Sequence, residues 1–249
     1  MGTPLDGYSL NARYLPALIV MLPLWLAFAV WFPPDKQFLG VFASAGVTLV
    51  LSTLLAQVGR DAGKARQKAL FVEWGGPPSM RALSYQTGIV NHVTLARCHA
   101  ALKTLVPTLQ LPESELAEKD NWDSAKKNYE SASDYLREAT RDKAAFRLVY
   151  AENVNYGFRR NLWAMKPRGV GTCLIRLVAV VTHASTRDLA KEGLTGIDAA
   201  SALLAVVLIT FWCLRFTKSW VKVAADEYSS RLIASAEVLA TKSSKAAKE

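Results

Sequence analysis

Residues 14–34 read YLPALIVMLPLWLAFAVWFPP, and residues 38–59 read FLGVFASAGVTLVLSTLLAQVG; neither run contains Asp, Glu, Lys or Arg. A charge-free run of about 20 residues is the length that an α-helix needs to cross a hydrocarbon core of about 30 Å. Only Asp35, Lys36 and Gln37 separate the two runs. The sequence therefore predicts a tight hairpin of two transmembrane helices. Buried core helices of soluble proteins are seldom so long and so evenly apolar.

Two further apolar segments follow, at residues 169–185 and 196–214, and Arg176 and Asp198 lie within them. The charged residues concentrate between the two hairpins. The sequence thus predicts an all-α membrane protein with four transmembrane helices, an inserted cytosolic helical domain and a C-terminal cytosolic helix. The expected domains are an N-terminal transmembrane hairpin (1–59), a cytosolic helical sensor domain (60–168), a pore-lining C-terminal transmembrane hairpin (169–214), and a cytosolic helix with a disordered tail (215–249).

Lysine and arginine near the membrane ends predict the orientation, because cytoplasmic loops carry an excess of both. They cluster after the second span, before the third and after the fourth, whereas the opposite side has only Lys36, Arg187 and Lys191. We therefore expect a multi-pass membrane protein with both termini and the inserted domain in the cytosol. Residues 215–241 lack Gly and Pro, so the fourth helix is expected to continue as an amphipathic stalk. The stalk either joins subunits or packs on the inserted domain of its own chain.

No pattern in the sequence indicates an enzyme. There is no phosphate-binding glycine loop with a following lysine, and Gly169-Val-Gly171 is too short for a dinucleotide fingerprint. The three cysteines, Cys98, Cys173 and Cys213, do not pair by spacing, and we expect free thiols. The histidines do not have a metal-ligand spacing. We expect no catalytic residue, no metal and no cofactor.

The third apolar segment places a charge in the membrane. Four residues share one stripe at helical spacing and are candidates to line a pore: Thr172, Arg176, Ala179 and His183. An arginine in a membrane segment usually faces the bundle interior or water. A ring of arginines in an oligomer favours anions. The alternatives are that Arg176 pairs with an acid such as Asp198, or that it extends to the cytosolic interface.

A basic and aromatic junction, residues 153–168, precedes this segment. Arginine forks bind phosphates and aromatic faces stack on bases. The candidate ligand-binding residues are Arg81, Arg97, Tyr156, Arg159, Arg160 and Trp163. The alternative is interfacial anchoring, with arginines on lipid headgroups and Trp163 in the aromatic belt.

Three runs, residues 11–18 (NARYLPAL), 57–64 (QVGRDAGK) and 153–163 (NVNYGFRRNLW), resemble a family of bacterial integral membrane proteins. The chain resembles the membrane effector of Hailong-type anti-phage systems, which is encoded beside a nucleotidyltransferase. The resemblance implies a homotetrameric ion channel whose gate is controlled by a single-stranded oligodeoxyadenylate. The oligomer keeps the channel shut, and its loss during infection opens the channel and stops growth.

We therefore expect an oligomeric ion channel, gated by a cytosolic anionic nucleotide or single-stranded DNA oligomer, that acts as a toxic effector in anti-phage defence. The alternative is a non-conducting membrane adaptor that recruits a soluble partner protein through the acidic and basic faces of residues 113–141.

Overall fold

The computed structural model describes residues 7–31, 38–185 and 196–246, and all of their side chains except those of residues 27–31, 38–48, 183, 184 and 197. Every regular element in these ranges is a helix, which confirms the predicted all-α class. The chain divides into two compact units. Unit 1 comprises residues 1–67 and 157–221, and unit 2 comprises residues 68–156 and 222–249.

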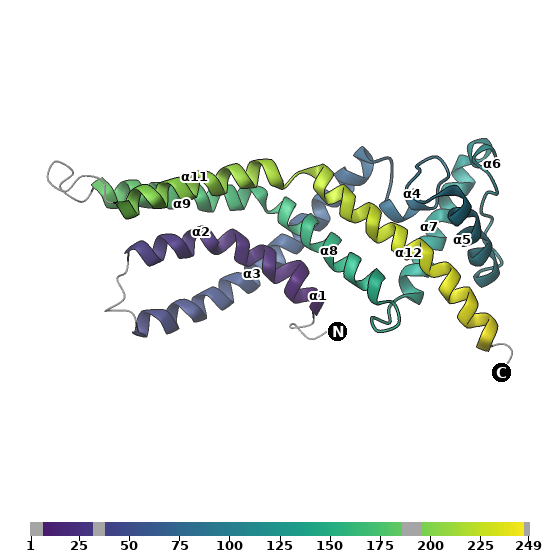
Figure 1. Ribbon diagram of the computed structural model, residues 1–249, viewed down its shortest axis with the longest axis horizontal. Coiled ribbons are helices and arrows are strands. Elements are labelled where there is room, and N and C mark those ends of the chain that lie inside the picture. The colour runs from purple at the N-terminus through teal and green to yellow at the C-terminus, as the bar shows by residue number, and fades with distance from the viewer. Residues whose placement is uncertain (1–6, 32–37, 186–195, 247–249) are drawn as a thin grey trace. The chain divides into compact units, whose positions relative to one another are not determined.

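Unit 1 is a bundle of long helices. It begins with a short turn of helix α1 (Gly7–Ser9) and a π-helical segment η1 (Leu10–Tyr14), which lead into α2 (Leu15–Trp31). It continues with most of α3 (Phe38–Glu73), the end of α8 (Arg147–Ala164), α9 (Lys166–Ser185) and α11 (Gly196–Arg215). Helix α9 packs against both α2 and α11, and Figure 1 shows α9 and α11 running side by side.

The junction between α8 and α9 depends on Met165 and Gly169. The backbone N–H of Met165 still bonds to the carbonyl of Asn161 at 3.0 Å, and Pro167 falls in the first turn of α9, where its missing N–H is tolerated. A Cβ at Gly169 would lie 2.3 Å from the indole of Trp212. Glycine is therefore required here, because α9 and α11 approach each other so closely that no side chain fits.

Helix α11 ends at Arg215, and a separate helix α12 (Lys218–Ala246) begins three residues later. The sequence predicted one continuous helix. The hydroxyl of Thr217 accepts a hydrogen bond from the backbone N–H of Trp220 at 3.2 Å, which is how an N-cap starts a new helix. Helix α12 then reaches Ala246, so residues 242–246 are helical and do not belong to the predicted disordered tail. This segment contains no Gly or Pro that would end the helix.

Unit 2 surrounds an ordinary apolar core. It contains the end of α3, then α4 (Pro78–Ala82), α5 (His92–Leu105), α6 (Glu115–Asp120), α7 (Trp122–Ala139), the start of α8 and most of α12. The side chain of Asn91 caps α5 by accepting from the backbone N–H of Val93 at 2.9 Å. Ser114 caps α6 in the same way through Ala117. The largest fully buried side chains of unit 2 are Leu70, Met80, Leu83, Leu95, Leu102, Tyr129, Leu136, Leu232 and Ile233.

Helix α12 packs on the core of unit 2 in its own chain. Leu232, Ile233 and Ala236 are fully buried there. Of the two roles left open for the stalk, packing on the inserted domain is therefore the one that the structure contains.

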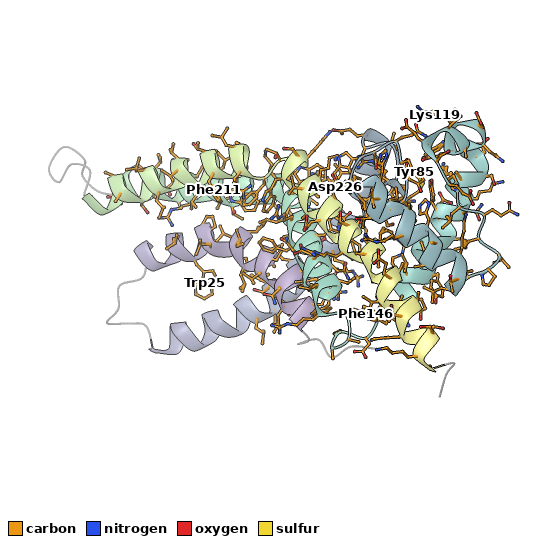
Figure 2. All side chains as sticks on the ribbon, turned by 45° about the vertical axis from the view of Figure 1, so that its right-hand side comes forward. Trp25, Tyr85, Lys119, Phe146, Phe211 and Asp226 are labelled. Carbon is orange, nitrogen blue, oxygen red and sulfur yellow. The ribbon has the colours of Figure 1, made fainter. Side chains whose placement is uncertain are left out.

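A buried polar network also holds unit 2 together. Glu118 of α6 is completely buried and accepts hydrogen bonds from the Ser84 hydroxyl at 2.5 Å, the Tyr85 backbone at 2.8 Å and the Gln86 amide at 3.3 Å. Figure 2 labels Tyr85 on the segment after α4. The ring nitrogens of His99 face the carbonyl oxygens of Leu83 at 2.9 Å and Pro112 at 3.1 Å. These bonds fix the loops on either side of α5.

Two segments are long and apolar enough to cross a membrane, Gly7–Leu26 and Asp198–Arg215. They correspond to the first and fourth predicted spans. The same criterion does not select the predicted spans at residues 38–59 and 169–185 from the described residues. Helix α9 includes Lys166, Arg168 and Arg176, which lower its mean hydropathy. The prediction of four spans is thus confirmed only in its coarser part, a helical fold with two candidate membrane helices.

The buried His99 predicts a pH-dependent stability. Burial lowers its pKa, although the two carbonyl oxygens oppose this effect. The unfolded chain therefore binds more protons than the folded one as the pH falls below about 6.5, and stability falls by up to about 1.4 kcal/mol per pH unit. Thermal unfolding of the full chain in detergent between pH 7.5 and 5 should show this decline.

Replacing His99 with Gln should remove most of that pH dependence. The exposed His92 provides the matched control, because His92→Gln should leave the slope as it is in the unmodified protein. If both variants keep the slope, carboxylates elsewhere account for it and the assignment to His99 is wrong.

Candidate functional site

Unit 1 exposes large apolar side chains over much of its surface, around a small apolar core that includes Val20, Met165 and Trp212. Its buried residues also include several polar and charged ones. The buried polar residues are Ser9, Ser52, Arg160, Asn161, Arg176, Asp198 and Ser201. The exposed apolar residues include Leu18, Leu22, Leu49, Val50, Leu54, Leu174, Ile175, Val178, Val181, Leu203, Val206, Val207, Phe211 and Leu214. Exposed apolar area of this extent marks a surface that is covered in the functional state.

The guanidinium of Arg176 lies inside this bundle. Its Nε and Nη2 donate to the carbonyl oxygen and hydroxyl of Ser201 on α11, at 3.3 and 2.6 Å. Its Nη1 donates to the carbonyl oxygen of Pro23 on α2 at 3.3 Å. Arg176 is only 3% exposed. One side chain on α9 is thus bonded to the two helices that flank it.

The other members of the α9 stripe are placed as follows. The hydroxyl of Thr172 donates to the carbonyl oxygen of Val20 on α2 at 2.8 Å, and Ala179 is half-buried. The side chain of His183 lies outside the described residues. Thr172 and Arg176 therefore contact helices of the same chain. Asp198, the carboxylate weighed as a partner for Arg176, is also buried, but the hydrogen bonds given above for Arg176 go to a hydroxyl and to carbonyl oxygens.

Two of the candidate ligand-binding arginines form ion pairs within unit 2. Arg81 donates to the carboxylate of Asp226 on α12 at 3.2 Å, and both side chains are largely buried. Figure 2 labels Asp226, which also pairs with Lys222. Arg97 pairs with Glu237, also on α12, at 3.1 Å. These carboxylates compensate the two charges that the sequence assigned to a phosphate.

The remaining candidates lie on α8, in different surroundings. Tyr156 is buried in unit 2 and stacks on Tyr228, with ring centroids 6.2 Å apart. Arg160 is buried in unit 1, where it donates to the Gln67 side chain at 2.5 Å. Its guanidinium also donates to Asn161 at 3.1 Å.

Arg159 and Trp163 are half-buried parts of unit 1. The guanidinium of Arg159 lies 5.1 Å from the ring centre of Trp220 and donates to its carbonyl oxygen at 3.1 Å. Trp163 is contacted by Arg66, at 5.8 Å from the ring centre. The six candidates therefore divide evenly between the units, and neither unit contains all of them.

Unit 2 contains a cavity that the sequence analysis did not identify. Its volume is about 410 Å³. Lys68, Phe71 and Val72 of α3 form one side, and Trp122, Lys126 and Glu130 of α7 form another. The turn at Gly75 and Gly76, followed by Pro77 and Met80, completes the lining. The cavity combines two aromatic rings with two lysines, which suits a flat ring that carries a negative charge.

The local sequence explains how each side of the cavity forms. Phe71 and Val72 follow Lys68 by three and four residues, and Trp122, Lys126 and Glu130 are four residues apart, so each set lies on one face of its helix. Gly75 has φ of +81° and Gly76 has φ of +132°, values that side chains rarely adopt. A Cβ at Gly75 would meet no atom within 4 Å. The glycine pair lets α3 end in a tight turn. The Gly-Gly-Pro-Pro turn is visible in the sequence, but its proximity to Trp122 is tertiary.

The described residues offer little for catalysis. Among them, no group of His, Cys, Asp and Glu is arranged to hold a metal ion. Burial, with the nearby Glu237, raises the pKa of Cys98 to about 12. This thiol is therefore protonated at neutral pH and is a poor nucleophile.

Comparisons with protein-family models, curated proteins and solved structures find no match for this chain. The function is therefore argued from the geometry of the described residues.

The Arg81–Asp226 pair gives a direct test of whether Arg81 is structural. Replacing Arg81 with Ala leaves the carboxylate of Asp226 partly buried, so the protein should lose about 1–3 kcal/mol of stability. Asp226→Ala should cost a similar amount, and the double variant should lose less than the sum of the two. Chemical unfolding of the four proteins in detergent measures this coupling.

Coupling near zero would show that the pair contributes nothing and that Arg81 is available to a ligand. Arg97→Ala is the comparison, because its pair with Glu237 is far more exposed and should contribute less than about 1 kcal/mol.

Proposed function

We propose that this chain is an oligomeric ion channel of the bacterial inner membrane, gated by an anionic nucleotide or single-stranded oligonucleotide that binds to unit 2. The observation that carries the proposal is that most of the exposed large apolar side chains among the described residues belong to unit 1 and few belong to unit 2. In this proposal lipid replaces water around unit 1. Exposed leucines and valines are therefore stable there, and buried polar groups need internal partners.

The exposed apolar side chains also support membrane positions for α3 and α9. Leu49, Val50 and Leu54 are exposed on α3, and Ile175 and Val178 on α9. A helix with this exposure in water would be an aggregation site. We therefore place four helices in the bilayer, α2, the first part of α3, α9 and α11. The cationic residues Lys166, Arg168 and Arg215 lie at the expected cytosolic ends of α9 and α11.

The cavity of unit 2 is the ligand site in this proposal. Its aromatic side chains, Phe71 and Trp122, would stack on a base, and Lys68 and Lys126 would meet the phosphates. Glu130 lies in the same lining and suits an exocyclic amino group, which donates hydrogen bonds. The ion pairs of Arg81 and Arg97 make these two arginines less suitable than the cavity lysines.

The sequence resemblance supplies the biological part of the proposal. It implies a homotetramer, an oligodeoxyadenylate ligand made by a partner nucleotidyltransferase, and a toxic effector role in anti-phage defence. A net charge of +9 is consistent with a polyanionic ligand and with anionic lipids.

Arg176 would hold the closed state. Its bonds to Pro23 and Ser201 join α9 to α2 and α11, so a conducting path along the α9 stripe requires these contacts to change. Hydrogen bonds to a charged group are each worth about 1.5–3 kcal/mol. These three hydrogen bonds of Arg176, which we call the latch, are therefore strong enough to shift a gating equilibrium by an order of magnitude or more.

The cavity can be tested by oligonucleotide binding. Trp122→Ala should weaken binding of a fluorescent single-stranded oligodeoxyadenylate roughly 5- to 150-fold, since stacking contributes about 1–3 kcal/mol per base. Lys126→Glu should also weaken binding and reduce its salt dependence. Fluorescence anisotropy of the purified full chain at fixed salt measures both.

Lys127→Glu is the matched control, because Lys127 is exposed on the same helix and does not line the cavity. If the two lysine variants lose equal affinity, only general charge matters and the cavity is not the site. An unmodified protein that binds no oligonucleotide would remove the ligand-gated part of the proposal.

The latch can be tested in planar bilayers. Arg176→Leu should raise the open probability about 10-fold or more, and Ser201→Ala, which removes one of the three hydrogen bonds, should change it in the same direction by less. Arg168→Leu is the control, because Arg168 is exposed at the end of the same helix. Unchanged conductance and open probability in Arg176→Leu would exclude both a pore-lining and a gating role for this arginine.

The second candidate function is a non-conducting membrane adaptor. The observation that favours it is that Asp226 and Glu237 already neutralise Arg81 and Arg97, which leaves unit 2 with fewer cations for a polyanion. A purified protein that is monomeric in detergent and carries no ion flux in liposomes would favour the adaptor.

A further inference from the structure

A group of cations lies at the C-terminal end of α11, in unit 1. The Lys166 ammonium donates to the carbonyl oxygens of Cys213 at 2.8 Å and Phe216 at 3.4 Å. The guanidinium of Arg215 lies 4.9 Å from the ring centre of Trp220, and Arg159 approaches the same ring at 5.1 Å. The two guanidiniums are therefore within about 10 Å of each other, close enough for direct repulsion.

Two of these three cations, Lys166 and Arg215, have no carboxylate partner among the described residues. The indole N–H of Trp220 is buried and has no acceptor among the described residues. Two cations and a buried donor thus gather at one place. Such a set is stabilised by an anion with several acceptor oxygens.

An apolar groove leads to this group. It has a volume of about 460 Å³ and is lined by Val206, Val207, Thr210, Phe211, Leu214 and Arg215. The hydroxyl of Thr210, its one neutral polar group, donates back to the carbonyl oxygen of Val206 at 2.9 Å. Figure 2 labels Phe211 on α11. At 1.5 Å per residue, the lining extends over about 13 Å, which matches roughly ten methylenes of an extended chain.

We propose that this groove and its cations form a binding site for one anionic phospholipid. One acyl chain lies along α11 from Leu214 toward Val206, and the phosphate contacts Arg215, with Lys166 beside it. The apolar groove on α11 is followed at the end of that helix by the ring of Trp220 and the cations Arg215 and Lys166, an order that matches chain, interface and headgroup in a lipid. The inference rests on the membrane part of the proposed function and is independent of the nucleotide ligand.

The site excludes a free phosphate compound as its main ligand, because the groove contributes only through burial of an acyl chain. Each buried methylene is worth about 0.8 kcal/mol, so a ligand without chains would lose most of its affinity. The site also prefers an anionic headgroup to a zwitterionic one, because a zwitterionic headgroup carries a cation that the arginines repel.

The test uses the full chain, purified in detergent and stripped of lipid. Phosphatidylglycerol, phosphatidylcholine or glycerol phosphate is added, and thermal unfolding is followed by tryptophan fluorescence. We expect Tm to rise with phosphatidylglycerol well above the effect of phosphatidylcholine, and not to respond to glycerol phosphate. A shift by glycerol phosphate equal to that by phosphatidylglycerol would overturn the lipid assignment in favour of a phosphate site.

Variants separate the two parts of the site. Arg215→Gln should raise the phosphatidylglycerol concentration needed for half of the shift about fivefold, whereas the control Arg168→Gln removes the same charge from an exposed position outside the group and should change little. Val207→Asn should weaken binding of both lipids. Its control is Val178→Asn, on α9, and the two valines have similar exposure, 53% and 63%.

Equal effects of Arg215→Gln and Arg168→Gln, or no preference for the anionic lipid in the unmodified protein, would overturn the inference. Its failure can be told from failure of the channel: ion flux with no lipid preference removes only the lipid site, and lipid preference without flux removes only the channel.

Discussion

The guanidinium of Arg176 constrains the packing of unit 1, because it is charged and almost completely buried among apolar helices. A buried arginine remains charged and carries five N–H donors, so the surrounding helices must supply acceptors. They do so through one carbonyl oxygen on α2 and a carbonyl oxygen and hydroxyl on α11. The packing of α9 between these helices follows from that requirement. Gly169 permits the close packing of α9 against α11 near the start of α9, because the indole of Trp212 occupies the space that a side chain at position 169 would fill.

In unit 2 the element on which most of the packing depends is α12. This helix supplies Leu232 and Ile233 to the apolar core, and it also supplies Asp226 and Glu237, which pair with Arg81 and Arg97. Removing α12 would therefore uncover apolar area and leave a buried arginine without its partner at the same time. The pairing gives each of two arginines that look suited to a phosphate in the sequence a carboxylate partner within unit 2.

Local patterns were sufficient for the helices, the separation of apolar from charged segments, and the acidic first turn of α6. Contacts between distant residues were not predictable in this way. Arg81 and Asp226 are 145 positions apart, and no periodicity links them. Trp122 joins Phe71 in one cavity only because α3 and α7 both border the Gly75–Gly76 turn. Glu118 lies in the first turn of α6, where the local pattern indicates only a favourable charge at a helix start, but three donors from the segment after α4 bond to it and it is completely buried. The break at Thr217 depends on one side-chain hydrogen bond and has no Gly or Pro to reveal it.

The proposed gating has an energetic requirement that several cavities in an oligomer meet more readily than one. A ligand shifts a conformational equilibrium by no more than its difference in affinity for the two states. Moving a gate from 1:99 to 99:1 needs about 5.5 kcal/mol, whereas stacking of one base provides about 1–3 kcal/mol in total. Stacking in one cavity is therefore insufficient by itself, whereas four cavities in a tetramer that changes state together need a difference of only about 1.4 kcal/mol each. Helix α3 carries both the cavity residues Lys68 and Phe71 and the exposed Leu49 and Leu54, so a ligand in unit 2 contacts a helix that continues into unit 1. An oligonucleotide that fills several cavities would meet the requirement more readily than a mononucleotide, because each further base after the first binds at a high effective concentration.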